Sequence, residues 1–175
     1  MSTPVLLLDA AWRVDRVIGV EHACEMLLGG RVVSASEDIA KVMHSPSIAV
    51  PVPSVVARTG RLHASEARPP LCSARRVRQR DAHICQFVID GEPCDRRGDS
   101  VDHLKPVSHG GPGTWSNLVA ACRVHNQTKA DRTLSEMQRR HGWGLRRAPY
   151  VPTRAQLLVA SISFPQPAWE PYLVA

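Results

Sequence analysis

Residues 101 to 129 read VDHLKPVSHGGPGTWSNLVAACRVHNQTK. An ordinary segment of this length would carry apolar side chains at helical or strand period. Here the apolar residues only frame polar ones, namely an Asp-His pair, a Gly-Gly pair, an Asn, a Cys-x-x-His pair and an Asn-x-x-Lys. Such a density of potential ligands predicts a functional site rather than a hydrophobic core.

The stretch resembles the HNH endonuclease motif, or ββα-metal finger. In that motif a His preceded by Asp comes first, an Asn follows, and a His or Asn lies on the next helix. His103 and Asn117 match the first two positions. The third is His125 if the letters are taken literally, or Asn126 by the family's usual spacing of nine residues after the central Asn. We take Asn126.

The resemblance implies the fold class. It implies an α+β chain in which a ββα-metal (HNH) finger with structural zinc follows a small α/β N-terminal region. The expected finger has strands near 99–103 and 117–121 and a helix from about 122 to 129. The resemblance is strong over residues 73–133 and weaker over 5–58, where a P-S-V-V-A-R segment is similar to one that precedes HNH domains in a bacterial and phage subfamily.

The chemistry of phosphodiester hydrolysis fits these residues. It needs an activated water, a cation that neutralises charge on the phosphate and the leaving oxygen, and positioning of the phosphate. A neutral imidazole can take a proton from water, a role worth roughly 10²–10⁴ in rate, so His103 is the candidate general base. Asp102 and Asn126 offer hard oxygens that suit one Mg²⁺ or Mn²⁺. By resemblance, Asn117 braces the loop between the strands so that the imidazole stays aimed.

Cysteine spacing predicts a second metal site. Cys122 and His125 have the C-x-x-H spacing of half a tetrahedral zinc site, with His where the zinc-bearing branch of the family has a second Cys. Cys85 and Cys94 could supply the other half, although the eight residues between them exceed the family's usual C-x-x-C spacing. A site with four protein ligands leaves no open position, so this zinc would be structural.

Alternatives to this ligand set stay open. His83 and Cys72 could substitute as ligands, and Cys85 and Cys94 could instead be small buried hydrophobes. The chain has five cysteines and no secretory signal or long apolar span, so a disulfide framework is not expected.

The charge distribution favours a nucleic-acid partner. The chain has a net charge of +6. Residues 1 to 50 hold four basic and six acidic residues, and the remainder, which contains the motif, holds 18 basic and 10 acidic. Clustered arginines on both flanks of the motif are typical of phosphate binding. The expected DNA contacts are Arg75, Arg76, Arg78, Arg80, Lys129 and Arg132.

The chain divides into four expected parts: an accessory α/β region (1–58), a linker (59–72), an HNH nuclease domain (73–147) and a Pro-rich tail (148–175) that is extended or mobile. Apolar periodicity and capping residues predict secondary structure outside the finger. The expected strands are 5–8, 31–34 and 47–57, and the expected helices are 19–28, 73–81 and 134–141.

These observations predict a metal-dependent HNH endonuclease that hydrolyses DNA, with one strand nicked by each active site. The alternative is a zinc-stabilised DNA-binding module that does not cut, and RNA cleavage also stays open. We expect a cytoplasmic protein of a bacterial or phage-infected cell, with no membrane association. Further expected partners are a second copy of the chain and a terminase or other phage packaging protein.

Overall fold

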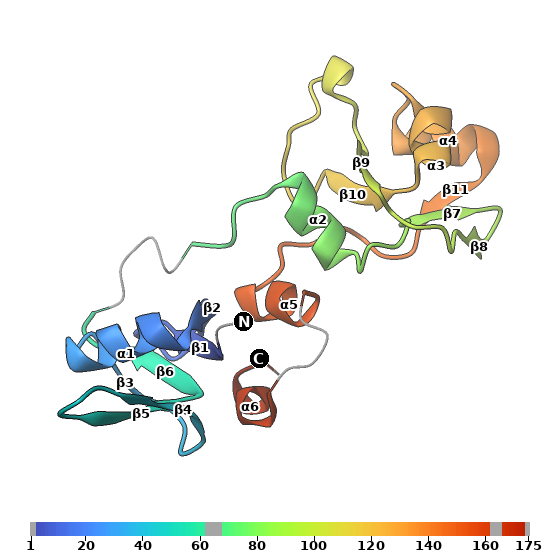
Figure 1. Cartoon of the computed structure of the whole chain (residues 1–175). Coiled ribbons are helices and arrows are strands. Elements are labelled where there is room, and N and C mark those ends of the chain that lie inside the picture. The colour runs from blue at the N-terminus through green and yellow to red at the C-terminus, as the bar shows by residue number, and fades with distance from the viewer. Residues whose placement is uncertain (1–2, 62–67, 162–165, 174–175) are drawn as a thin grey trace. The chain divides into compact units, whose positions relative to one another are not determined.

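The computed structural model describes residues 3–61, 68–161 and 166–173, and it contains two compact units (Figure 1). The first unit comprises Met1–Pro69 together with Thr153–Ala175, and the second comprises Pro70–Pro152. Most of the expected linker, residues 62–67, lies outside the described residues, as does Pro165 of the expected tail.

The first unit is built on a four-stranded sheet in the order β2-β1-β6-β3. β1 pairs antiparallel with β2 and parallel with β6, and β3 pairs antiparallel with β6. A helix, α1, and a hairpin of β4 and β5 complete the N-terminal part. The bounds are β1 Pro4–Leu8, β2 Val14–Gly19, α1 Val20–Leu28, β3 Val32–Ser34, β4 Ile39–His44, β5 Ala49–Pro53 and β6 Val55–Arg58.

Both faces of this sheet are buried. Val5 and Leu7 of β1 pack in one apolar cluster with α1, whereas Leu6 and Leu8 pack in a second cluster on the opposite face. Successive side chains of a strand point to opposite faces, so a strand covered on both faces is apolar throughout. This explains the VLLL run, which the sequence correctly predicts to be a strand.

The C-terminal segment contributes to the second cluster, and the expectation of an extended or mobile tail is wrong for residues 154–159 and 167–173. It forms α5 (Arg154–Val159), a 3₁₀ turn (Pro167–Trp169) and α6 (Glu170–Leu173). Thr153 and Gln156 form a reciprocal capping box that starts α5. The indole of Trp169 is buried and donates a hydrogen bond to the Ser54 carbonyl at 2.9 Å.

The second unit contains the expected ββα arrangement, which is confirmed. β9 and β10 form an antiparallel pair, with His103 opposite Leu118, and α3 follows β10 directly. Cys122 caps α3, because its Sγ accepts a hydrogen bond from the His125 backbone nitrogen at 3.4 Å. The bounds are α2 Ala74–Arg80, β9 Ser100–His103, β10 Leu118–Ala121, α3 Arg123–Lys129 and α4 Leu134–His141.

A three-stranded sheet that the sequence analysis did not predict, in the order β11-β7-β8, completes this unit. β7 (Phe87–Ile89) and β8 (Glu92–Pro93) form a hairpin, and β11 is Trp143–Leu145. Asp90 and Gly91 have φ of 51° and 85°, as a two-residue type I′ turn requires. The residues between Cys85 and Cys94 are therefore a tight hairpin, which returns the chain to its starting point.

Candidate functional site

Four side chains of the second unit form a cluster that could hold a zinc ion. The ligand atoms of Cys85, Cys94, Cys122 and His125 all lie within 4.8 Å of one another. The β7–β8 hairpin brings the first two together, and the first turn of α3 presents the other two. Tetrahedral zinc with three sulfurs and one nitrogen places its donors roughly 3.5–4 Å apart, so the set fits. Neither His83 nor Cys72 belongs to the cluster.

The environment of this cluster also fits a metal. Burial raises the pKa of the Cys85 thiol to about 12, and the thiolates of Cys122 and Cys94 add to the shift, against backbone hydrogen bonds that lower it. Burial and then the charge of Arg96 lower the pKa of His125, which favours the neutral imidazole that binds metal. A cation among the thiols would offset their mutual repulsion.

Arg146 holds the backbone beside two of these ligands. Its Nε donates to the Cys85 carbonyl at 3.2 Å, and its guanidinium donates to the Cys94 carbonyl at 2.7 Å. Such contacts orient metal ligands without touching the metal. The sequence analysis placed Arg146 only within a basic flank, because no motif marks a side chain that binds carbonyls 52 and 61 residues away.

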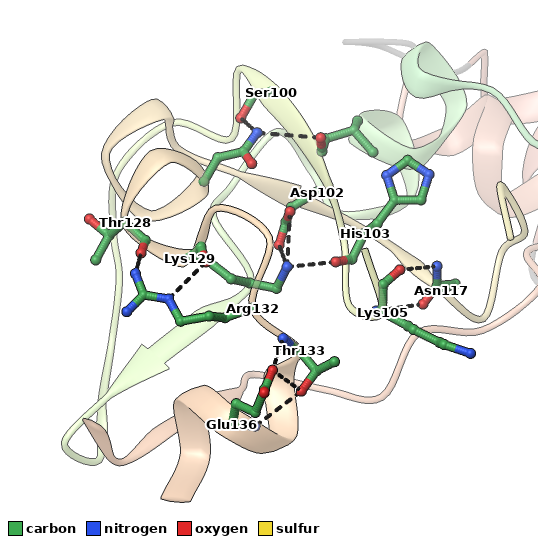
Figure 2. A network of polar contacts seen from close by, with 12 residues as sticks. Ser100, Asp102, His103, Lys105, Asn117, Thr128, Lys129, Arg132, Thr133 and Glu136 are labelled. Carbon is green, nitrogen blue, oxygen red and sulfur yellow. Dashed lines mark hydrogen bonds and ion pairs between the residues drawn. The ribbon is translucent and has the colours of Figure 1, made fainter. Parts of the chain in front are cut away.

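The Asp-His pair lies on β9 with its two side chains directed apart. Asp102 is buried and faces α3, whereas His103 is half-buried and its imidazole points away from Lys129 (Figure 2). The alternation of a strand accounts for this difference. The imidazole is thus the accessible member of the pair, and the carboxylate is the enclosed one.

Asn117 closes the loop between β9 and β10. Its Oδ1 accepts from the Lys105 backbone nitrogen at 2.9 Å, and its Nδ2 donates to the Lys105 carbonyl at 3.0 Å (Figure 2). The same Nδ2 also donates to the Pro112 carbonyl at 2.9 Å. Gly111 permits this closure, because a Cβ there would lie 1.7 Å from the Lys105 carbonyl oxygen. Asn117 therefore braces the loop that follows His103.

Lys129 does not contact solvent, so the expectation that it binds phosphate is wrong. Its side chain is fully buried, and Nζ donates to the His103 carbonyl oxygen at 2.6 Å and to Asp102 Oδ1 at 3.2 Å. Asp102 Oδ2 lies 3.0 Å from the same ammonium. Burial raises the pKa of Asp102, and the hydrogen bond and charge of Lys129 oppose that rise.

The two residues expected to hold a catalytic cation are bound within the protein through only some of their polar atoms. Asp102 Oδ1 accepts a hydrogen bond from the Lys129 ammonium, whereas Oδ2 is buried and accepts none from the described residues, although it lies 3.0 Å from Nζ. Asn126 Nδ2 donates to Ser100 Oγ at 3.0 Å and to the Val101 carbonyl at 3.4 Å, so these contacts do not use its side-chain oxygen. The orphaned Oδ2 of Asp102 is a carboxylate oxygen that could still bind a cation. The Mg²⁺ or Mn²⁺ site at Asp102 and Asn126 therefore stays a prediction.

Arg80 is a second expected DNA contact that is enclosed in the fold. Arg80 is buried, and its guanidinium binds both oxygens of Asp81 at 2.8 and 2.9 Å. It also donates to the carbonyls of Trp115, Leu118 and Tyr150. The prediction that Arg80 binds DNA is wrong because the buried carboxylate of Asp81 already neutralises its charge. Arg132, by contrast, is half-exposed and donates to the carbonyls of Thr128 and Lys129, which end α3 (Figure 2), so its DNA contact stays a prediction.

The other three arginines of α2 remain at the surface. Arg75 is exposed, while Arg76 and Arg78 are half-exposed. One guanidinium nitrogen of Arg76 binds the Leu71 carbonyl, and one of Arg78 binds the Asp99 carbonyl. Each guanidinium has further donors that could bind phosphate.

Comparison with known protein families gives one match in each unit. A family model described as HNH endonuclease-associated, N-terminal domain, matches residues 5–59, and one described as HNH endonuclease matches residues 84–132. Searches of curated proteins and of solved structures returned no match. Within the described ranges, no helix is long and apolar enough to cross a bilayer. The second match contains the zinc-type cluster and the β9-β10-α3 finger, so the chain carries an HNH endonuclease domain together with an HNH endonuclease-associated N-terminal domain.

Proposed function

We propose that this chain is an endonuclease that hydrolyses DNA phosphodiester bonds with His103 as general base. The observation that carries the proposal is the contrast at His103, whose imidazole is accessible while the backbone around it is bound on both sides. A general base must be held still and yet reach a water. The match to the HNH endonuclease family supports the same reaction.

The residues define one chemical step. His103 takes a proton from water as the water oxygen forms a bond to phosphorus, and the bond from phosphorus to the leaving sugar oxygen breaks. Negative charge develops on the phosphate oxygens and on the leaving oxygen, and cationic groups must meet it. A divalent cation, if held by Asp102 Oδ2 and the side-chain oxygen of Asn126, would supply this positive charge, while Asp102 Oδ1 stays bound to Lys129.

DNA is the proposed substrate because of where positive charge lies. α2 packs against β9 and β10, so its surface arginines belong to the same unit as His103. Arg75, Arg76 and Arg78 are the proposed backbone contacts. Such contacts are independent of sequence and position the duplex on the site.

A plasmid assay tests this function. Zinc-loaded protein is incubated with supercoiled plasmid in Mg²⁺, in Mn²⁺ and in EDTA, with a labelled RNA of matched length in parallel. The expected result is conversion of the plasmid to nicked circles, since one site cuts one strand. Binding of DNA without cleavage in any divalent cation would overturn the proposal.

The second candidate is a zinc-stabilised DNA-binding module without activity, and the ion pair between Lys129 and Asp102 favours it. A buried ion pair at this position is compatible with a purely structural role of the finger. The plasmid assay separates the two functions. A second copy of the chain, a packaging partner such as a terminase and a cytoplasmic location remain predictions.

A further inference from the structure

α3 closes the open edge of β9 with side chains. Antiparallel pairing uses alternate residues of a strand, and the Leu104 N–H bonds the Asn117 carbonyl at 2.8 Å across the β9–β10 ladder. The carbonyls of Val101 and His103 therefore face the opposite edge, where no strand pairs with β9 in the described part of the chain. Asn126 Nδ2 reaches the first at 3.4 Å, and Lys129 Nζ reaches the second at 2.6 Å.

The spacing of the two donors along α3 matches the spacing of the two carbonyls along β9. Asn126 and Lys129 are three residues apart, so they lie on the same face of α3. Val101 and His103 are two residues apart and present their carbonyls to the same edge. The helix thus supplies the donors that a neighbouring strand would otherwise supply.

The peptide unit that joins His103 to Leu104 is held at both ends. Lys129 Nζ binds its carbonyl oxygen, and the Asn117 carbonyl accepts from its N–H at 2.8 Å. A peptide unit is planar, so two contacts on opposite sides fix its rotation and with it ψ of His103. The direction of the imidazole then follows from the fixed backbone.

Burial makes the Lys129 contact strong. The side chain is fully buried, and Asp102 supplies the counter-charge at 3.0 Å that keeps an ammonium in such a place. A charged donor on a carbonyl is a stronger bond than a neutral one. Among the residues that the structure describes, no other charged donor reaches the His103 carbonyl.

We propose that Lys129 is the positioning residue of the HNH site, which fixes the His103–Leu104 peptide unit opposite Asn117 and so aims the general base. The proposal rests on the proposed function for its effect on catalysis. The contact between Lys129 and His103 is testable without any activity.

The first measurement needs no variant. In isotope-labelled full-length protein, the Lys129 ammonium should give a slowly exchanging NMR signal with scalar coupling through the hydrogen bond to the His103 carbonyl carbon. An ammonium that exchanges with water like those of exposed lysines would overturn the proposal. If the wild-type protein fails to nick DNA, the proposed function is wrong, but the NMR result on the contact between Lys129 and His103 still stands.

The second measurement uses Lys129→Met, which keeps the length of the side chain and removes the donor. Its kcat for nicking should fall about 10- to 100-fold, with KM and DNA affinity changed less than about twofold, because the base is misaimed and not removed. The His103 carbonyl carbon should shift upfield, while that of Val101 should stay in place. Lys41→Met, at an exposed lysine of β4, is the matched control and should keep the wild-type kcat.

Two outcomes contradict the proposal. If Lys129→Met keeps zinc and the wild-type kcat, Lys129 does not aim His103. If the variant raises KM and weakens DNA binding at unchanged kcat, Lys129 is a phosphate contact after all. Where the variant fails to fold, the wild-type coupling measurement still decides the question.

Discussion

Asn117 binds both backbone polar groups of Lys105 through one side-chain amide. Oδ1 accepts from Lys105 N at 2.9 Å, and Nδ2 donates to Lys105 O at 3.0 Å. The amide thereby replaces a strand partner at the point where β9 ends. This arrangement sets the start of the loop immediately after His103 and Leu104.

Asn117→Ala should destabilise the second unit. The substitution leaves the Lys105 N–H, the Lys105 carbonyl and the Pro112 carbonyl without this partner, and Asn117 is buried. Each missing hydrogen bond costs about 1 kcal/mol or more, so we expect a free energy of unfolding lower by about 2–4 kcal/mol. Urea unfolding followed by tryptophan fluorescence measures it. Ser116→Ala, at an exposed neighbour, is the control, and equal stability of both variants would refute the bracing role.

Zinc affinity should depend on pH through Cys85. In the metal-free fold the pKa of the Cys85 thiol is raised to about 12, which favours the protonated thiol. The contribution of this protonated thiol to stability is complete below the ordinary thiol pKa and is lost as pH rises through 12. Zinc requires the thiolate and displaces that proton. The affinity for zinc should therefore weaken about tenfold for each unit of pH decrease, per proton displaced. Competition with a chromophoric chelator between pH 8 and 6 measures the slope, and a flat profile would contradict the assignment.

Loss of a zinc ligand should remove the metal and the fold of the second unit. Structural zinc contributes about 10–16 kcal/mol of apparent binding energy in small finger peptides. Cys122→Ser should give poorly soluble protein with less than one zinc per chain. Cys24→Ser, in the first unit, is the matched control and should retain zinc. Full zinc content in the Cys122 variant would rule out this ligand set.

Substitutions on α2 should distinguish the surface arginines, which we expect to bind DNA, from the buried Arg80, which we expect to stabilise the fold. Arg76→Glu with Arg78→Glu should weaken binding to all DNA sequences and flatten the salt dependence by about 0.9 in log K for each phosphate that the variant no longer neutralises. Arg80→Met should instead lower stability by about 3–5 kcal/mol, because Asp81 loses its buried partner. The same salt slope in the double variant and the wild type would exclude α2 from the DNA interface.

The sequence predicted the finger because its residues are contiguous and their spacing is characteristic. β9, β10 and α3 follow from the motif, and the cysteine set was found despite the long interval between Cys85 and Cys94. Gly91 and Pro93 within that interval suit a turn that returns the chain to the metal, and the structure has a two-residue turn at Asp90 and Gly91.

The errors at Lys129 and Arg80 have one physical cause. Lysine and arginine are almost never buried unless paired, so a basic side chain beside a nuclease motif is reasonably expected at the surface. The partner of Arg80 is its neighbour Asp81, and that of Lys129 is Asp102, 27 residues earlier. Only the fold determines whether such a pair is enclosed.

The central claim is that His103 is the general base. The most direct measurement compares His103→Ala with the wild-type protein in plasmid nicking, with zinc content and DNA affinity measured on the same samples. We expect the nicking rate to fall by about 10² or more, with zinc retained and DNA affinity changed less than about twofold, since proton abstraction contributes only in the transition state. Nicking by His103→Ala at the wild-type rate would contradict the account.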